Sequence, residues 1–153
     1  MHYRKHNGFT LIELVIVLVI IGSVAVIALP RWAPSDTTVG AQADRLARDL
    51  RHIQAMAMSQ ARTLTVDIQP TTAYRVIDGA SMTVTDPATQ QPFQVTLDNN
   101  VTVSGTDTGF DSLGRPVAGG SLLAAARVFT VSGNTRSATV TVSPVTGFIS
   151  VTP

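Results

Sequence analysis

The sequence predicts an α+β fold, in which a long N-terminal helix packs its second half against an antiparallel β-sheet domain. Three observations predict this fold. An apolar run covers residues 9–29, and a second segment, residues 39–62, repeats apolar side chains at helical spacing. From residue 63 onward, valine alternates with threonine and serine in short runs, which is the period of a strand with one buried face.

The apolar run is long enough to cross a membrane as a helix. Its 21 residues contain one charge, Glu13, and would extend roughly 31 Å, about the thickness of the hydrocarbon core. Arg4 and Lys5 precede the run, and positive residues favour the cytoplasmic side. We therefore expect a single transmembrane helix over residues 9–30, with the N-terminus in the cytoplasm and the C-terminal domain outside the inner membrane, in the periplasm.

Glu13 requires an explanation, because a charge in hydrocarbon costs roughly 2.5 to 3.5 kcal/mol even on the gentler insertion scales. A glutamate this close to the helix end could reach the lipid headgroups. Two other interpretations of the run stay open. It could be a secretory signal peptide, although the apolar region of such peptides is shorter, ~7–15 residues. It could also be an uncut anchor that holds a periplasmic binding domain or enzyme.

Residues 31–62 are expected to form the second half of the helix, after a kink. Pro30 and Pro34 predict the kink, because proline interrupts the hydrogen bonds of a helix. After it, apolar residues recur on one helix face from roughly residue 39, at positions 46, 50, 53 and 57. We expect this face to cover one side of the β domain.

Residues 63–153 are expected to form the antiparallel β domain. Strands are predicted at residues 63–69, 73–77, 81–85, 93–97, 101–104, 127–132, 138–143 and 148–152. The segments SGNTRS and SPVTG are predicted to be tight turns. The glycine-rich residues 105–126 are expected to form a loop.

Composition argues against several kinds of activity. Beyond Leu29, nine arginines balance nine aspartates, whereas a broad nucleic-acid surface is normally basic. The chain has no cysteine, and His52 is its single histidine beyond residue 8. No spacing of a nucleophile and a base is visible. We therefore expect no enzymatic activity, no cofactor, no resident metal and no DNA partner.

Two weaker binding hypotheses remain. Arg115, Arg127 and Arg136 could bind an anion if the fold brings them together. With the loop at residues 105–120, such a cluster could bind DNA or a surface. Asp107, Asp111 and the segment LDNN at residues 97–100 offer oxygen ligands suited to calcium, although these residue types are also common in turns.

The N-terminal sequence RKHNGFTLIELVIVLVIIGSVAVIALP resembles the prepilin-type N-terminus of type IV pilins and type II secretion pseudopilins. The resemblance implies that residues 1–8 are a leader and that a membrane peptidase cuts between Gly8 and Phe9. It also implies that Phe9 is then N-methylated. Glu13, as the fifth mature residue, would pair with the new amine of its own or a neighbouring subunit.

A second resemblance covers the rest of the chain. The helix, the β-rich remainder, FDSLGRP and the closing hairpin resemble the GspH/FimT branch of minor pilins and pseudopilins. Members of that branch that take up DNA carry basic residues near the C-terminus, whereas this chain ends in GFISVTP. We therefore expect a minor pilin or pseudopilin that assembles with other pilin subunits through its N-terminal helix. The alternatives are a ligand-binding minor pilin and the uncut membrane-anchored domain.

Overall fold

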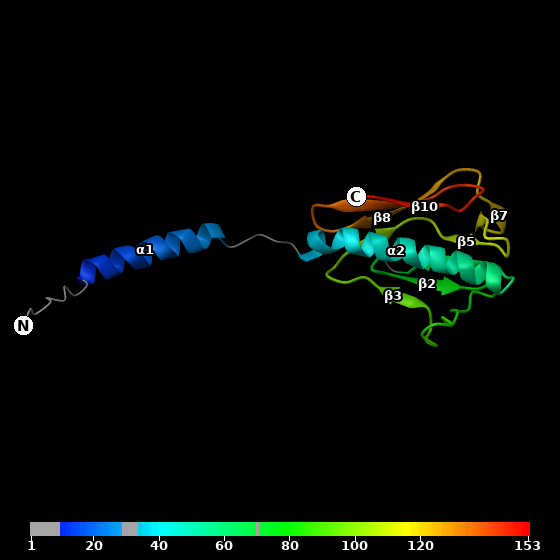
Figure 1. The fold of residues 1–153 in the computed structure, drawn as a ribbon, viewed down its shortest axis with the longest axis horizontal. Coiled ribbons are helices and arrows are strands. Elements are labelled where there is room, and N and C mark those ends of the chain that lie inside the picture. The colour runs from blue at the N-terminus through cyan, green and yellow to red at the C-terminus, as the bar shows by residue number, and fades with distance from the viewer. Residues whose placement is uncertain (1–9, 29–33, 70) are drawn as a thin grey trace, which may run out of the picture. The chain divides into compact units, whose positions relative to one another are not determined.

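The computed structural model describes residues 10–28, 34–69 and 71–153. The chain forms two compact units, Met1–Trp32 and Ala33–Pro153, and we call the second unit the body (Figure 1). Within the described ranges, no helix is long and apolar enough to cross a membrane. The segment expected to do so, residues 9–30, includes Phe9, Leu29 and Pro30, which lie outside the described residues.

Helix α1, Leu11–Ala28, is the described helix of the N-terminal unit. Every large apolar side chain from Leu11 to Ile21 is exposed, by 43% to 82%. A helix that is apolar on all sides is normally buried in a protein core or in lipid. The side chains of α1 are therefore suited to an apolar environment.

Helix α2, Pro34–Ser59, is the long helix of the body. Its buried stripe confirms the predicted one and extends it toward the N-terminus, because six side chains at heptad spacing are at most 3% exposed: Val39, Ala43, Leu46, Leu50, Ile53 and Ala57. The helix starts earlier than predicted, at Pro34, and the expected kink between Pro30 and Pro34 falls on residues 29–33, outside the described residues. Proline fits the first turn of a helix, where the N–H groups have no intrahelical partners.

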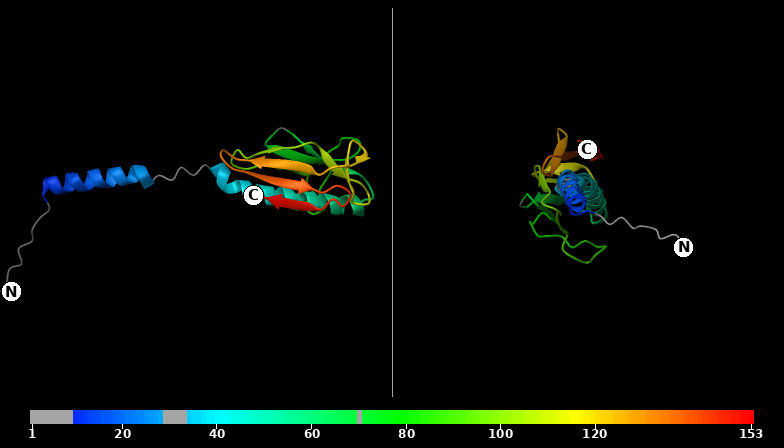
Figure 2. Two further views of the ribbon diagram at one scale, coloured as in Figure 1. Left: turned by 90° about the horizontal axis from the view of Figure 1, so that it is seen from above. Right: turned by 90° about the vertical axis from the view of Figure 1, so that its left-hand side faces the viewer.

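Two antiparallel sheets complete the body and confirm the predicted fold class. The first has the order β3 (Gln94–Thr96), β2 (Ala73–Ile77), β1 (Leu64–Ile68), β5 (Thr108–Phe110), β6 (Pro116–Ala118), β7 (Ser121–Leu122). The second has the order β10 (Ile149–Thr152), β9 (Ser137–Val142), β8 (Arg127–Ser132), β4 (Thr102–Ser104). Helix α2 packs against strands of both sheets, and Figure 2 shows it running alongside them.

The predicted strand at residues 81–85 is wrong. The segment makes only isolated bridges, between Thr83 and Ile77 and between Thr85 and Pro92. Asp78 accepts hydrogen bonds from the N–H groups of residues 80 and 82, and Asp86 accepts one from the N–H of residue 88. These side chains fold the backbone into turns on both sides of the segment, which leaves no room for a longer ladder.

The predicted loop over residues 105–126 is also wrong, because it contains β5, β6 and β7. Glycine at position 109 belongs to the strand pairing itself. A Cβ there would lie 2.5 Å from the carbonyl oxygen of Leu64 on β1. Gly114, at a φ of +75°, provides the turn between β5 and β6. The glycines that suggested a loop therefore serve a close strand contact and a hairpin turn.

Strand β10 is an edge strand, and α2 covers part of it. The Arg51 guanidinium donates a hydrogen bond of 2.9 Å from Nη2 to the carbonyl oxygen of Ile149. Exposed strand edges are templates for pairing with other chains, and a charged side chain over the edge prevents such pairing.

Helix α2 ends in a Schellman motif that has alanine where glycine is usual. The N–H of Arg62 donates to the carbonyl oxygen of Ala57, and the N–H of Ala61 donates to that of Met58. Ala61 adopts a left-handed φ of 51°, a conformation that disfavours a Cβ.

Ala61→Gly is therefore expected to stabilise the body by about 0.5 to 1 kcal/mol. The measurement is the free energy of unfolding in urea. Ala55→Gly is the matched control, because Ala55 is exposed and lies inside α2, about one turn before its end, and we expect this change to destabilise by about 1 kcal/mol. Equal destabilisation by both variants would contradict the left-handed end of the helix.

Candidate functional site

Glu13 lies in the first turn of α1, directly after the helix cap. The Thr10 hydroxyl oxygen accepts a hydrogen bond of 3.3 Å from the N–H of Glu13, and the Thr10 carbonyl accepts one from Leu14. Threonine followed three residues later by glutamate is the capping-box pattern. A carboxylate in the first turn also interacts favourably with the positive end of the helix dipole. The sequence therefore contained a second, purely local reason for Glu13, which our sequence analysis missed.

The carboxylate of Glu13 is the single charge in the described part of α1. It stands on an exposed helix surface among leucine, isoleucine and valine side chains. Any apolar partner that covers this surface also covers the carboxylate, which then needs an opposite charge or a donor. Gly8 and Phe9, the two residues expected at the processing site, lie outside the described residues.

Arg115 is already paired within its own hairpin. Its Nη2 lies 2.7 Å from Oδ2 of Asp111, and its Nε donates to the same oxygen at 2.8 Å. Burial raises the pKa of Asp111, but the hydrogen bonds from Arg115 and from the N–H of Leu113 outweigh it, so the pKa lies below its usual value. This pairing stabilises the turn between β5 and β6.

The structure does not bring the three candidate arginines together. Arg127 begins β8, opposite Val142, whereas Arg136 lies in the turn at the other end of the β8–β9 hairpin. The Nε of Arg127 is buried without a hydrogen-bond partner in the described part of the chain. An anion site built from Arg115, Arg127 and Arg136 together is therefore not formed.

The candidate calcium ligands are also separate, and each aspartate has another partner. Asp98 accepts a hydrogen bond of 3.0 Å from Gln42, and Asp107 accepts one of 3.2 Å from the N–H of Ile68. Asn99 and Asn100 supply the two positive φ angles of a tight turn, at 56° and 57°. No group of three or more acidic or histidine side chains that could hold a metal occurs among the described residues.

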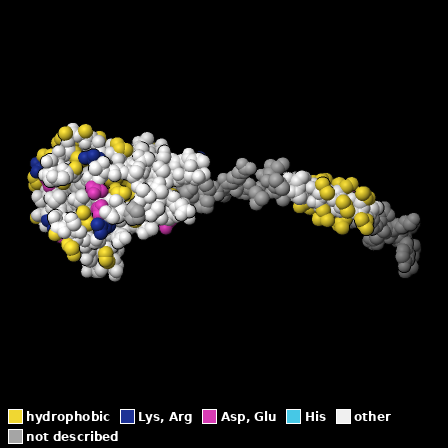
Figure 3. Space-filling model, turned by 180° about the vertical axis from the view of Figure 1, so that it is seen from behind, with side chains coloured by type: hydrophobic (Ala, Val, Ile, Leu, Met, Phe, Trp, Pro, Cys, Tyr) yellow, Lys and Arg dark blue, Asp and Glu magenta, His cyan; other side chains and the backbone are white. Residues whose placement is uncertain are grey.

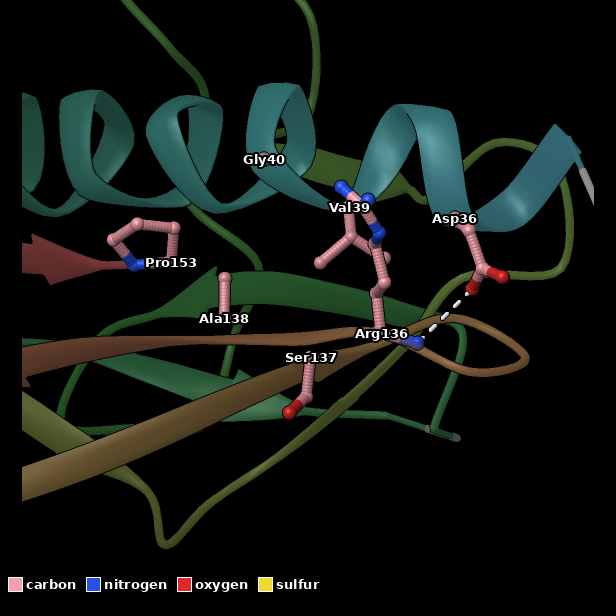
Figure 4. A pocket seen from close by; sticks show the side chains of 7 residues that line it. All are labelled: Asp36, Val39, Gly40, Arg136, Ser137, Ala138 and Pro153. Carbon is pink, nitrogen blue, oxygen red and sulfur yellow. Dashed lines mark hydrogen bonds between the residues drawn. The ribbon is translucent and has the colours of Figure 1, made fainter.

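A pocket of about 340 Å³ opens beside the first turns of α2. Asp36, Val39 and Gly40 of α2 line it, together with Arg136, Ser137 and Ala138 of the β8–β9 hairpin and with Pro153. We call it the hairpin pocket. Figure 4 shows the Arg136 side chain extending from the hairpin toward α2.

Asp36 joins the hairpin to α2 at the edge of this pocket. Its carboxylate accepts hydrogen bonds from the Thr135 hydroxyl at 2.5 Å, from the Thr135 N–H at 2.8 Å and from the Arg136 N–H at 3.1 Å. The bond from the Thr135 hydroxyl, with those from the backbone, lowers the pKa of Asp36. The carboxylate is thus occupied, whereas the Arg136 guanidinium makes no ion pair with any described residue.

An exposed apolar surface lies at the other end of the body, where α2 ends. We call it the apolar tip, and it comprises four side chains that are 47% to 72% exposed: Met58, Leu113, Val145 and Phe148. Figure 3 shows hydrophobic side chains at this end, at the left of the view.

Gln54 of α2 holds the two turns of the apolar tip together. Its Nε2 donates to the carbonyl oxygens of Gly114, at 2.7 Å, and Thr146, at 3.3 Å. A Cβ on Gly147 would lie 2.6 Å from that nitrogen and 3.0 Å from the Gly114 oxygen. No sequence signal marks this role, because it depends on segments 60 and 92 residues apart in the chain.

Comparison with known proteins agrees with this architecture. Residues 3–29 match the prokaryotic N-terminal methylation motif, and residues 42–147 match the type II transport protein GspH family. A comparison with curated protein sequences gives no match.

Two solved structures share the fold. The type IV minor pilin FimU of Pseudomonas aeruginosa (strain PAO1) is 17% identical, with a TM-score of 0.56 over 74% of this chain and 92% of that chain. The minor pseudopilin EpsH from the type 2 secretion system of Vibrio cholerae is 11% identical, with a TM-score of 0.53 over 74% of this chain and 94% of that chain. Because the GspH match spans more than half of the 153 residues, the chain belongs to the type II transport protein GspH family, within the pilin and pseudopilin group that its N-terminus resembles.

Proposed function

We propose that this chain, a structural subunit of a type IV pilus or a type II secretion pseudopilus, matures in two covalent steps. A membrane peptidase cuts between Gly8 and Phe9 on the cytoplasmic side, and Phe9 is then N-methylated. The observation that carries the proposal is the methylation motif, which matches residues 3–29 and so includes both residues. The leader ahead of the cut carries Arg4 and Lys5, which favour a cytoplasmic N-terminus.

The mature N-terminus then explains the carboxylate of Glu13. Cleavage creates an ammonium on Phe9, four residues and about one helical turn from Glu13. Two opposite charges attract strongly where water is excluded, and breaking a buried pair costs about 3 to 5 kcal/mol because one charge stays uncompensated. A subunit that docks with both charges paired is therefore favoured over one in a shifted register.

In this proposal the apolar surface of α1 is buried in two environments, one before assembly and one after it. Before assembly, the helix anchors the subunit in the inner membrane, with the body in the periplasm. After assembly, the same surface packs against the N-terminal helices of other pilin subunits. Its exposed side chains, 43% to 82% exposed from Leu11 to Ile21, support this use because both environments are apolar.

Gly8→Val tests the processing step. The wild-type chain is expected to start at methylated Phe9, whereas the variant is expected to keep residues 1–8, because a branched side chain blocks the cut. The measurement is mass spectrometry of the N-terminal peptide from membranes of cells that contain the peptidase.

Gly22→Val is the matched control, since a Cβ on Gly22 meets nothing within 4 Å. This control is expected to be cut and methylated like the wild type. A Gly8→Val chain that starts at methylated Phe9 would contradict the assignment, and an intact wild-type N-terminus would favour the uncut membrane-anchored domain.

A further inference from the structure

We propose that Asn100 is an acceptor site for an N-linked glycan. The proposal rests on the proposed function in one respect, because glycans linked to a polyprenyl diphosphate lipid are transferred to proteins outside the inner membrane, where we expect the body to lie. The site itself is defined by the sequence around Asn100 and by the turn in which that residue lies.

The sequence around Asn100 has the pattern of a glycan acceptor. Residues 98–102 read DNNVT, and asparagine followed two residues later by threonine, with no proline between them, is the acceptor pattern. Asn100 is the single asparagine of this sequence that has it, because phenylalanine, valine and arginine stand two residues after the other three. Asp98 also supplies a carboxylate two residues before Asn100, and bacterial transferases of this class recognise an acidic residue at that position.

Asn100 lies at the surface, in the tight turn between β3 and β4. Its φ is 57° and that of Asn99 is 56°. The N–H of Val101 closes the turn by donating to the Asp98 carbonyl oxygen at 3.1 Å. Both asparagines are exposed. An exposed turn is the structural setting in which the acceptor pattern has meaning, because a buried asparagine could not hold a group as large as a glycan.

The side-chain amide of Asn100 is available for reaction. It makes no hydrogen bond with any residue that the structure describes, whereas the neighbouring Asp98 carboxylate accepts one of 3.0 Å from Gln42 of α2. On the other side of Asn100, Val101 is fully buried. The backbone is therefore held on both sides of an exposed side chain, and a glycan attached there would stay outside the folded body.

Thr102 supplies the hydroxyl that completes the acceptor pattern. It begins β4, opposite Ser132 of β8, and its hydroxyl donates to the Ser132 carbonyl oxygen at 3.4 Å, which is long for such a bond. The transferase has to bind residues 98–102 as a free segment, whereas Thr102 is paired in the folded sheet. We therefore expect transfer to precede the pairing of β4 with β8, and folding then leaves the product exposed.

The transfer needs no oxidant or reductant. The Nδ2 atom of Asn100 forms a bond to the anomeric carbon of the first sugar. The bond between that carbon and the diphosphate oxygen breaks, and its electron pair leaves with the polyprenyl diphosphate. One amide proton passes to a base of the transferase. The product is an N-glycosyl amide, which places a bulky, hydrated group over the turn between β3 and β4.

The two asparagines of the turn form a matched pair for the test. Asn99→Gln and Asn100→Gln each replace an exposed side chain at nearly the same φ, 56° and 57°, so we expect a similar cost to the fold. Only Asn100 has threonine two residues later. The full chain is produced in cells that contain the membrane peptidase and a bacterial oligosaccharyltransferase with its lipid-linked glycan. The measurement is the mass of the peptide that contains residue 100.

We expect the glycan on the wild-type chain and on Asn99→Gln, and its complete loss from Asn100→Gln. Thr102→Ser keeps the hydroxyl and is expected to keep the glycan. Thr102→Val keeps a β-branched side chain suited to β4 but is expected to lose the glycan. Asp98→Asn keeps an acceptor for the Gln42 amide but removes the charge, and it is expected to lose the glycan as well.

A wild-type peptide of unmodified mass would overturn the proposal, as would a glycan that persists in Asn100→Gln or disappears from Asn99→Gln. A glycan that persists in Asp98→Asn would overturn the role of Asp98. The N-terminal peptide from the same samples separates this proposal from the proposed function. A chain that starts at methylated Phe9 with an unmodified Asn100 contradicts the glycan alone, whereas a glycan on an uncut chain contradicts the processing alone.

Discussion

Glu13→Ala is expected to give a chain that is cut and methylated normally yet is missing from the filament. If the proposed pairing holds, the substitution leaves the Phe9 ammonium without its partner in apolar surroundings, which costs about 3 to 5 kcal/mol. Such a loss lowers incorporation by more than a hundredfold on the affinity scale of about 1.4 kcal/mol per factor of ten. The measurement is the ratio of this chain in the sheared filament fraction to that in the membrane.

Two variants separate the charge of Glu13 from its place in the helix cap. Glu13→Gln keeps the length and the capping-box residue type but removes the charge, and it is expected to fail like Glu13→Ala. Thr10→Ala removes the hydroxyl that accepts the Glu13 N–H at 3.3 Å but keeps the charge. It is expected to cost about 1 kcal/mol of helix stability and to assemble. Wild-type assembly of Glu13→Gln would refute the pairing and leave the cap as the role of Glu13.

Gly109→Ala is expected to be the most damaging small substitution in the body. The added Cβ would lie 2.5 Å from the Leu64 carbonyl oxygen and 3.1 Å from the Thr65 Cα. Both atoms are backbone of β1, which pairs with β5 through Thr65 and Gly109. Because relief requires the two strands to separate, we expect a loss of about 3 kcal/mol, at the upper end for overpacked cores.

The measurement for Gly109→Ala is the thermal midpoint of the body, which is expected to fall by roughly 10 °C. Gly79→Ala is the matched control, since a Cβ there meets nothing within 4 Å, and its midpoint is expected to stay within about 2 °C of the wild type. Equal midpoints for the two variants would show that β1 and β5 are not as close as described.

Local patterns predicted most of the fold because the body follows them closely. The stripe that includes Leu46, Leu50 and Ile53 is buried as its spacing requires, and β8 covers the predicted residues 127–132. The two wrong predictions, a loop over residues 105–126 and a strand over residues 81–85, came from residue patterns that occur in more than one kind of structure. Glycine at 109 suggested a loop, whereas it permits a close strand contact. The alternation in SMTVT suggested a strand, whereas turns at Asp78 and Asp86 confine it.

The candidate functional residues also fall into two groups: those that the sequence identifies and those whose role depends on the fold. The N-terminal motif could be identified from the sequence because it is defined by local order: basic residues, a glycine and a carboxylate at a fixed spacing. The arginines could not, because their meaning depends on which partners the fold supplies. Arg115 proved to pair with Asp111, four residues away, and Arg136 lies beside Val39 in a pocket that joins two distant segments.

The hydrogen bond from Arg51 to the Ile149 carbonyl affects how subunits can pair when they pack in a filament. Closely packed subunits would expose the unpaired edges of their sheets to one another, and strand pairing between neighbouring chains is hard to reverse. The Arg51 guanidinium occupies the Ile149 carbonyl and so covers part of the edge of β10. Contacts between neighbouring subunits are then left to side chains at this part of the edge.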